Sequence, residues 1–266
     1  MKTERRFSMG WRFAVAAVLA SSALQASAGG IPTSDVIPVK KITSAAPQSV
    51  IVKPQPVVPA NQKPLGWSLW DMALATAHFN TSGRSGRCGG ENNPPYPDTP
   101  FQILYTCETN PNNDFVVKDG TMFYLPVFMQ DDTAPVIGTF PDVRDKLDLN
   151  SYIFSMNQVG TVYAMITVDG WHYLLNKNYL AGVDVWPPLP DCDKEIDPNC
   201  SGGTRYATVA AFLKPLGKGW HTIEISAMFA GKQIKPWCEA INSMYQINYC
   251  KDEMDFKITY NVNVVE

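Results

Sequence analysis

The stretch YATVAAFLKPLGKGWHTIEISAMF, residues 206–229, decides the fold of this 266-residue chain. It contains two runs of strand-forming residues separated by the turn-forming KPLGKG. Five residues of the second run fall on one side of an extended chain, namely His221, Ile223, Ile225, Ala227 and Phe229. A period of two residues is typical of β-strands, and a Gly-containing turn between two such runs favours a hairpin. We therefore expect an antiparallel hairpin here.

Two other stretches place an Asp-Gly pair between strand-like runs, which also predicts a hairpin turn. They are DFVVKDGTMFYLPVFM, residues 114–129, and TVYAMITVDGWHYLL, residues 161–175. The second run of residues 114–129 is apolar on both faces, which predicts a central strand. Pro126 within that run predicts a bulge or a locally free edge, because proline has no N–H to donate.

The C-terminal FKITYNVNVV, residues 256–265, alternates between apolar and polar side chains and predicts a half-exposed strand of an antiparallel sheet. WSLWDMALATAHF, residues 67–79, predicts a short helix that begins with a capping box at Ser68 and Asp71. Its apolar residues at helical spacing are Trp67, Trp70, Leu74 and Ala77. These patterns predict a mainly β protein, an antiparallel β-sandwich or jelly-roll-like domain with one short N-terminal helix.

The chain has three histidines. His221 begins a core-facing row, so we expect it at the rim of the sandwich, bonded to a backbone carbonyl. His172 points to the opposite side of its strand, across from Thr167, and His78 lies at the C-terminal end of the predicted helix, where a cation favours the helix dipole. A copper or zinc site on His172 and His221 is the alternative, but it would need a further ligand and convergence of the two side chains.

The first 28 residues have the features of a signal peptide. The apolar run FAVAAVLASSAL follows basic residues, and the small residues ASA at positions 26–28 fit a cleavage site. Residues 29–65 are rich in proline, which predicts an extended tether, with recognition by a partner as the alternative. Residues 66–266 are expected to form a single domain. We therefore expect a secreted or periplasmic protein with no membrane span after processing.

The leader holds four of the 22 basic residues and one of the 25 acidic ones, so its removal changes the formal charge from −3 to −6. An acidic chain without Lys/Arg clusters is a poor nucleic-acid binder. None of the six cysteines lies in the leader, and no Cys-x-x-Cys pair is present, which favours disulfides over metal thiolates. Each neighbouring pair brackets a loop-like segment, so among the many possible connectivities we expect sequential pairing: Cys88–Cys107, Cys192–Cys200 and Cys238–Cys250.

Several motifs occur in a fixed order along the chain: WSLWDMALAT, VKDGTMFYLPVF, ITVDG, FLKPLGKGWHTIEISA and FKITYNV. In this order the chain resembles a broad group of uncharacterised secreted prokaryotic proteins that share a VDG…LKPLxxGxHxI pattern. The group also has a PxG form ahead of one strand, where this chain has Lys118-Asp119-Gly120 before Thr121. This chain also inserts the two segments bounded by Cys192–Cys200 and Cys238–Cys250. The resemblance implies a secreted β-sandwich fold, and it supplies no catalytic residues.

Two groups of residues are candidates for binding. The acidic loop DCDKEIDPNC, residues 191–200, alternates hard oxygen ligands of the kind that Ca²⁺ prefers, and a stapled, solvated loop is the alternative. The predicted calcium ligands are Asp191, Asp193, Glu195 and Asp197. Aromatic residues in loop-like contexts could stack on sugar rings, with packing against the disulfides as the alternative. These are Trp186, Trp237, Tyr245 and Tyr249.

The sequence holds no Gly-x-Ser-x-Gly elbow, His-Glu-x-x-His pair, phosphate-binding loop or dinucleotide fingerprint. We therefore expect a non-catalytic domain that binds a glycan or an extracellular protein through its disulfide-stapled loops. A secreted hydrolase of polysaccharides is the alternative, because two carboxylates at a suitable separation hydrolyse glycosidic bonds. Its candidate acids are Asp131, Asp132, Asp142, Asp145 and Asp148. A structural component of the envelope or matrix is the third expectation.

Overall fold

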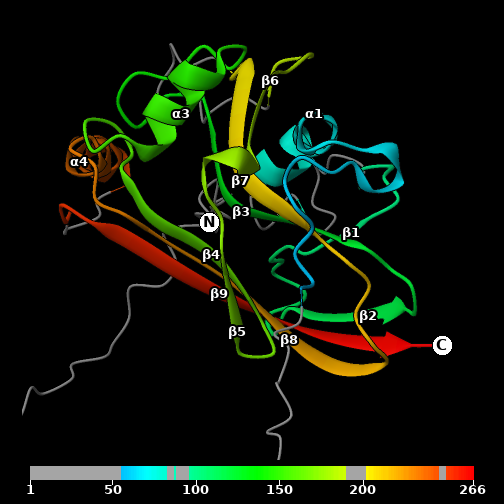
Figure 1. Ribbon diagram of the computed structural model, residues 1–266. Coiled ribbons are helices and arrows are strands. Elements are labelled where there is room, and N and C mark those ends of the chain that lie inside the picture. Colours follow the sequence, from blue (N-terminus) through cyan, green and yellow to red (C-terminus); the bar gives the residue numbers. More distant parts are fainter. Residues whose placement is uncertain (1–54, 83–86, 88–95, 190–201, 246–249) are drawn as a thin grey trace, which may run out of the picture.

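The computed structural model describes residues 55–82, 87, 96–189, 202–245 and 250–266 (Figure 1). The predicted leader, most of the predicted tether and the whole predicted calcium loop lie outside these residues. Three cysteines and one aromatic candidate also lie outside them, namely Cys88, Cys192, Cys200 and Tyr249.

The described chain is mainly β, with strands in two sheets. The four-stranded sheet has the order β1-β3-β7-β6 and is formed by β1 (Gln102–Ile103), β3 (Phe123–Asp131), β7 (Arg205–Leu213) and β6 (Leu180–Asp184). The five-stranded sheet has the order β2-β9-β8-β4-β5 and is formed by β2 (Asp114–Lys118), β9 (Met254–Val265), β8 (Gly219–Phe229), β4 (Thr161–Val168) and β5 (Trp171–Leu174).

Both sheets are mixed, so the prediction of purely antiparallel pairing is wrong. β1 runs parallel to β3, and β2 runs parallel to β9, while the remaining pairs are antiparallel. The parallel partners are far apart in sequence, and a local pattern of alternation carries no information about strand direction. The jelly-roll arrangement is not confirmed by these strand orders.

One of the three predicted hairpins is confirmed. β4 and β5 pair antiparallel around the turn at Asp169-Gly170, where both residues have positive φ (48° and 82°), as a two-residue hairpin turn requires. The other two hairpins are wrong. β2 and β3 belong to different sheets, and so do β7 and β8. At both connections the chain crosses from one sheet to the other, and β3 and β7 then pair with each other.

Two predictions about individual strands are confirmed. β3 lies between β1 and β7, and its register with β7 shifts between Pro126 and Phe128, so the proline occupies a bulge. β9 buries one side and exposes the other in alternation, as its sequence predicts. Its buried residues are Phe256, Tyr260, Val262 and Val264.

Two apolar clusters hold the layers together. The first lies between the sheets, where Phe128 of β3 contacts Phe229 of β8 with ring centroids 4.7 Å apart. The second lies between the other face of the four-stranded sheet and the helix α1 (Leu69–Thr81), which covers that face in Figure 1. β7 is therefore buried on both faces, which explains why its sequence does not alternate between apolar and polar residues.

The capping box of α1 is confirmed: the hydroxyl of Ser68 accepts from the backbone N–H of Asp71, and the Asp71 carboxylate accepts from the backbone N–H of Ser68. The predicted buried face is partly wrong, because Leu74 is 53% exposed whereas Met72 and Ala73 are fully buried. The buried face of the helix is formed by Leu69, Met72, Ala73, Thr76, Ala77, Phe79 and Asn80.

The structure has two α-helices besides α1 among the described residues, so the prediction of a single helix is wrong. α3 spans Lys146–Phe154 and α4 spans Ile234–Tyr245. In α4 the buried residues Ile234, Trp237 and Ile241 follow helical spacing, and Pro236 lies in the first turn, where a proline is tolerated. No helix in the described ranges is both long and apolar enough to cross a membrane.

The folded body begins earlier than the predicted boundary at residue 66. Val57 forms a β-bridge with Leu213 at the end of β7, and the N–H of Val58 donates to the carbonyl of Phe212. Both valines are buried, with 6% and 3% of their surface exposed. The last part of the predicted tether, from about Pro56, therefore belongs to the packed structure.

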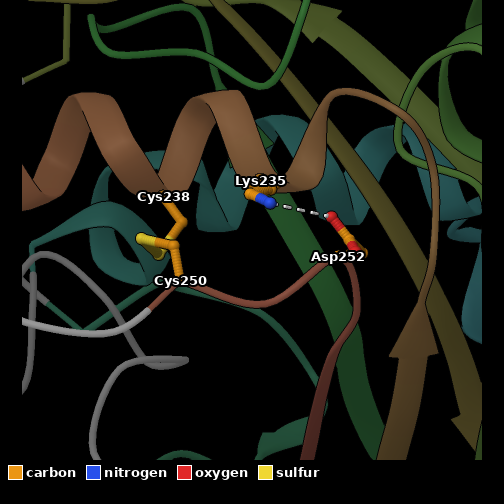
Figure 2. Close-up of a disulfide and its surroundings, with 4 residues drawn as sticks. All are labelled: Lys235, Cys238, Cys250 and Asp252. Atoms are coloured by element: carbon orange, nitrogen blue, oxygen red, sulfur yellow. Dashed lines mark ion pairs between the residues drawn. A yellow bond between two sulfur atoms is a disulfide. The ribbon is translucent and has the colours of Figure 1, made fainter.

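The predicted disulfide Cys238–Cys250 is present, with an S–S distance of 2.01 Å (Figure 2). It ties α4 to the segment that leads into β9, and the ion pair between Lys235 Nζ and Asp252 Oδ1, 3.5 Å apart, bridges the same two segments. Cys107 is also disulfide-bonded, and none of the cysteines in the described ranges is free.

Candidate functional site

A cleft of about 670 Å³ lies where four separate segments meet. They are the end of the predicted tether, the start of α1, the start of α3 and the 3-10 helix η2 (Lys177–Tyr179) with its flanking residues. The residues lining it are Pro59, Ala60, Asn61, Gln62, Lys63, Ser68, Leu69, Trp70, Lys146, Leu149, Asn176, Lys177, Asn178, Tyr179 and Leu180.

Local capping interactions fix the positions of the lining segments. Asp145 caps α3 through the backbone N–H of Leu147, which places Lys146 at the first residue of that helix. Asn176 caps η2 in the same way through the N–H of Asn178. The hydroxyl of Tyr179 donates to the carbonyl of Val58, 3.3 Å away, and thereby joins η2 to the end of the tether.

The aromatic residues of the cleft are anchored and the lysines are exposed. Trp70 and Tyr179 are partly buried and pack against both apolar clusters, so their rings have little freedom to move. Lys63, Lys146 and Lys177 are exposed. The cleft thus combines partly buried aromatic surface with exposed positive charge.

The cleft is positively charged although the whole chain is acidic. Its lining contains Lys63, Lys146 and Lys177 and no acidic residue. Asp71 follows the lining residue Trp70, and the hydrogen bonds from Ser68 lower its pKa, with a smaller contribution from the Lys63 ammonium. In an acidic molecule three lysines gathered around one concavity favour an anionic ligand.

The side chains of the cleft are of the types that bind sugars. Four amides lie around it, namely Asn61, Gln62, Asn176 and Asn178, and each carries donors and an acceptor for hydroxyl groups. Trp70 and Tyr179 supply aromatic surface. The lining residues include no carboxylic acid and no histidine, so the described part of the cleft has no carboxylate pair of the kind used by glycosidases.

His221 occupies the predicted position at the rim, bonded to a backbone carbonyl. Its Nε2 lies 2.7 Å from the carbonyl oxygen of Gly217, and its Nδ1 lies 2.7 Å from Oδ2 of Asp169. Both partners are acceptors, so both ring nitrogens donate. Partial burial acts to lower the pKa of His221, but the bonds to Asp169 and Gly217 outweigh it and raise this pKa above the usual value. With neither nitrogen free, His221 ties the β4–β5 turn to the β7–β8 connection.

The other two histidines lie elsewhere. Nδ1 of His172 is 2.9 Å from the hydroxyl of Thr167, the residue that the sequence placed opposite it. His78 lies in the last turn of α1, as predicted. His172 and His221 face opposite sides of the five-stranded sheet, and the described ranges contain no group of three or more metal-ligating side chains. The two-histidine metal site therefore gains no support.

The five acids of the hydrolase alternative bond to nearby backbone or arginine groups. Asp132 accepts from the backbone N–H groups of Thr204 and Arg205 and from Nε of Arg205, and it thereby joins the end of β3 to the start of β7. The other four carboxylates accept from backbone N–H groups within six residues of themselves and act as turn or helix caps: Asp131, Asp142, Asp145 and Asp148.

The aromatic candidates are divided between surface and core. Trp186 is 85% exposed, whereas Trp237 is only 8% exposed and donates its Nε1–H to the carbonyl of Pro135, 3.1 Å away. Tyr245 is the last residue of α4, and Tyr249 lies outside the described residues. A stacking role for these four residues stays a prediction, with Trp237 packed in the core, and so does calcium binding by residues 191–200.

Most residues of the cleft were not singled out from the sequence. Trp70 was interpreted only as part of a helix face, and Lys63 only as part of a tether. The capping motifs at Ser68 and Asp145 were the available signal, because they locate two helix starts, but no local pattern brings those starts together.

Comparison with known proteins found no matching family model, no matching curated protein and no matching solved structure. The resemblance to secreted prokaryotic proteins therefore stays a prediction, and the function is argued from the site alone.

Proposed function

We propose that this protein is an exported, glycan-binding protein that holds an acidic saccharide in the cleft between α1, α3 and η2. The observation that carries this proposal is the lining of the cleft: three lysines, four amides and two anchored aromatic rings, with no acid. The volume of about 670 Å³ lies within the range of small-molecule sites, about 300–1,000 Å³.

Each type of side chain has a counterpart in such a ligand. The ammonium groups of Lys63, Lys146 and Lys177 pair with carboxylate or sulfate groups of the sugar. The amides exchange hydrogen bonds with its hydroxyl groups. Trp70 and Tyr179 offer flat apolar surface to the C–H faces of a pyranose ring. A neutral glycan would leave the three charges without partners, so the proposal specifies an acidic one.

The proposal also includes export of the chain from the cytoplasm and an extended segment ahead of the domain. The leader at residues 1–28 directs the chain out of the cytoplasm, and the proline-rich residues from position 29 onward form an extended segment ahead of the domain. The disulfide between Cys238 and Cys250 supports this assignment, because such bonds persist in oxidising compartments.

Binding without turnover is favoured over hydrolysis. The acids that the hydrolase alternative requires are already hydrogen-bonded to backbone or arginine groups, and none of them lines the cleft. The glycan is therefore a bound ligand and leaves the site unchanged.

A panel of defined oligosaccharides tests the proposal. The mature chain is titrated with oligomers of uronic acids, with sulfated oligosaccharides and with neutral oligomers of equal length, while reducing ends are assayed in parallel. We expect binding of acidic oligomers that weakens as salt is raised, and no release of reducing ends. Equal affinity for neutral and acidic oligomers, no binding of any oligomer, or cleavage of a bound oligomer would each overturn it.

A further inference from the structure

The edge strand β2 (Asp114–Lys118) has an open side in the described structure. It pairs with β9 alone, because it is the edge strand of the five-stranded sheet, whose strands lie side by side in the order β2-β9-β8-β4-β5 (Figure 1). An unpaired strand edge offers N–H and C=O groups to another chain, and folded proteins usually protect such an edge. The middle of β2 carries an exposed valine, Val116, with 69% of its surface accessible.

The hydrogen bonds at the two ends of β2 show which backbone groups face outward. The carbonyl of Asn113 accepts from the N–H of Asn261, and the N–H of Asp119 donates to the carbonyl of Val265. Residues 113, 115, 117 and 119 therefore face β9, and the backbone groups of Asp114, Val116 and Lys118 point to the open side.

Part of this edge is already covered. The side chain of Asn110 bonds both backbone groups of Asp114, and the N–H of Thr121 donates to the carbonyl of Lys118. The backbone N–H and C=O of Val116 lie at the centre of the part of the edge that these bonds leave uncovered. A hydrogen-bonded antiparallel pair uses both groups of one residue, so Val116 is suited to sit opposite an identical residue.

The side chains of β2 are complementary to themselves. Asp114, Val116 and Lys118 are exposed on one face of the strand, with the valine midway between the two charges. Two copies of β2 placed antiparallel about Val116 bring Asp114 of each copy opposite Lys118 of the other. A two-fold interface requires this kind of self-complementarity, and opposite charges across a strand pair stabilise the pairing.

We propose that two copies of this chain associate through antiparallel pairing of their β2 edges about Val116, which joins the two five-stranded sheets. The interface involves one short strand from each copy, and it is therefore smaller than the roughly 1,200–2,000 Å² of stable interfaces. The dimer is weak and forms only at high protein concentration. The surface is separate from the cleft, so it does not depend on the proposed function.

Cysteine cross-linking tests the register. In a hydrogen-bonded antiparallel pair the two Cα atoms are about 5.5 Å apart, within the roughly 4.4–6.8 Å range that a disulfide spans. We expect Val116→Cys to give a covalent dimer under mild oxidation. The matched control is Val162→Cys, because Val162 is 54% exposed but lies on the inner strand β4. Equal amounts of dimer from the two variants, or none from Val116→Cys, would overturn the proposal.

A charge swap tests the pairing of Asp114 with Lys118. Sedimentation velocity over a concentration series should show weaker association for Lys118→Asp, which places like charges opposite each other. The double variant Asp114→Lys/Lys118→Asp restores opposite charges and should associate again. A double variant as weak as the single one, or association unchanged in both, would contradict the proposed register. Circular dichroism of each variant checks that the fold is retained.

Discussion

His221 links two strand connections through both of its ring nitrogens. Its two nitrogens donate to Asp169 and to the carbonyl of Gly217, so the charged form is favoured and neither nitrogen is available to a substrate. The alternation of side chains in β8 was sufficient to predict its place at the rim. The carboxylate partner was not predicted, because Asp169 belongs to a different strand connection.

The raised pKa of His221 makes its contribution to stability depend on pH. A folded-state pKa above the unfolded value of about 6.5 means that the stabilisation is complete below about pH 6.5 and is lost as pH rises through the folded value. We expect the difference in Tm between the wild type and Asp169→Asn to be largest near pH 6 and to shrink by pH 9. Asn-Gly also suits the hairpin turn, which makes this variant a mild one.

A Tm difference that stays constant between pH 6 and pH 9 would show that the ring is neutral in the folded state. His221→Gln provides the second variant. It removes the titrating group, so the Tm difference between this variant and its double with Asp169→Asn should not vary with pH over the same range.

Asp132 joins the end of β3 to the start of β7. It accepts three hydrogen bonds from Thr204 and Arg205, and its side chain is only 13% exposed. We expect Asp132→Ala to lower the free energy of unfolding by about 1–3 kcal/mol, because it leaves a partly buried arginine and two backbone donors without their acceptor. Urea denaturation followed by fluorescence measures this change. An unchanged midpoint would contradict the structural role.

At the scale of elements, turn chemistry predicts where the chain reverses but not which strand it pairs with next. The Asp-Gly pairs at 119–120 and 169–170 look alike in sequence. At 169–170 the next strand follows at once and pairs with the one before, whereas at 119–120 the chain continues through Thr121 and Met122 and enters the other sheet. The partner of β3 is β7, whose paired residues are 75 to 90 positions further along the chain, and its choice depends on burial that no local pattern encodes.

The lack of apolar–polar alternation in β7 was the local sign of its true position. A strand with one exposed face alternates, as β9 does, but every residue of β7 after Arg205 is buried. Such a strand requires cover on both sides, which α1 and the five-stranded sheet provide. If β7 had paired with the half-exposed β8 as a hairpin, one face of β7 would have been exposed to water.

The disulfide Cys238–Cys250 closes a loop with a sequence separation of 12 residues between α4 and β9. In the chain-entropy model a loop of this length stabilises the folded state by about 3 kcal/mol. We expect Cys238→Ala/Cys250→Ala to lower the free energy of unfolding by about 2–3 kcal/mol, with amide exchange accelerated first in α4. The ion pair Lys235–Asp252 is too exposed to compensate.

Exchange in α4 no faster than in the wild type would contradict this account of the disulfide. Lys235→Gln is the matched control, because it removes the ion pair from the same two segments and leaves the covalent link intact.

At the scale of the whole molecule, the cleft exists only because four distant segments converge. Residues 59–63, 68–70, 146–149 and 176–180 contribute to it, and each has an ordinary local explanation as tether, helix start or turn. The sequence therefore predicted the β-rich class, the capping box and one disulfide, and it missed the cleft. Long-range contacts that bring the segments together, such as Tyr179 with Val58, leave no local periodicity.

The most direct measurement is isothermal titration of an acidic oligosaccharide against two double variants that change the charge equally. Lys146→Gln/Lys177→Gln removes two ammonium groups from the cleft, and Lys214→Gln/Lys232→Gln removes two exposed ones elsewhere. If the cleft holds the anion, we expect the affinity for the oligosaccharide to fall at least tenfold in the first variant and less than twofold in the second. Equal losses of affinity in the two variants would contradict it, because they would show that binding depends only on the net charge of the protein.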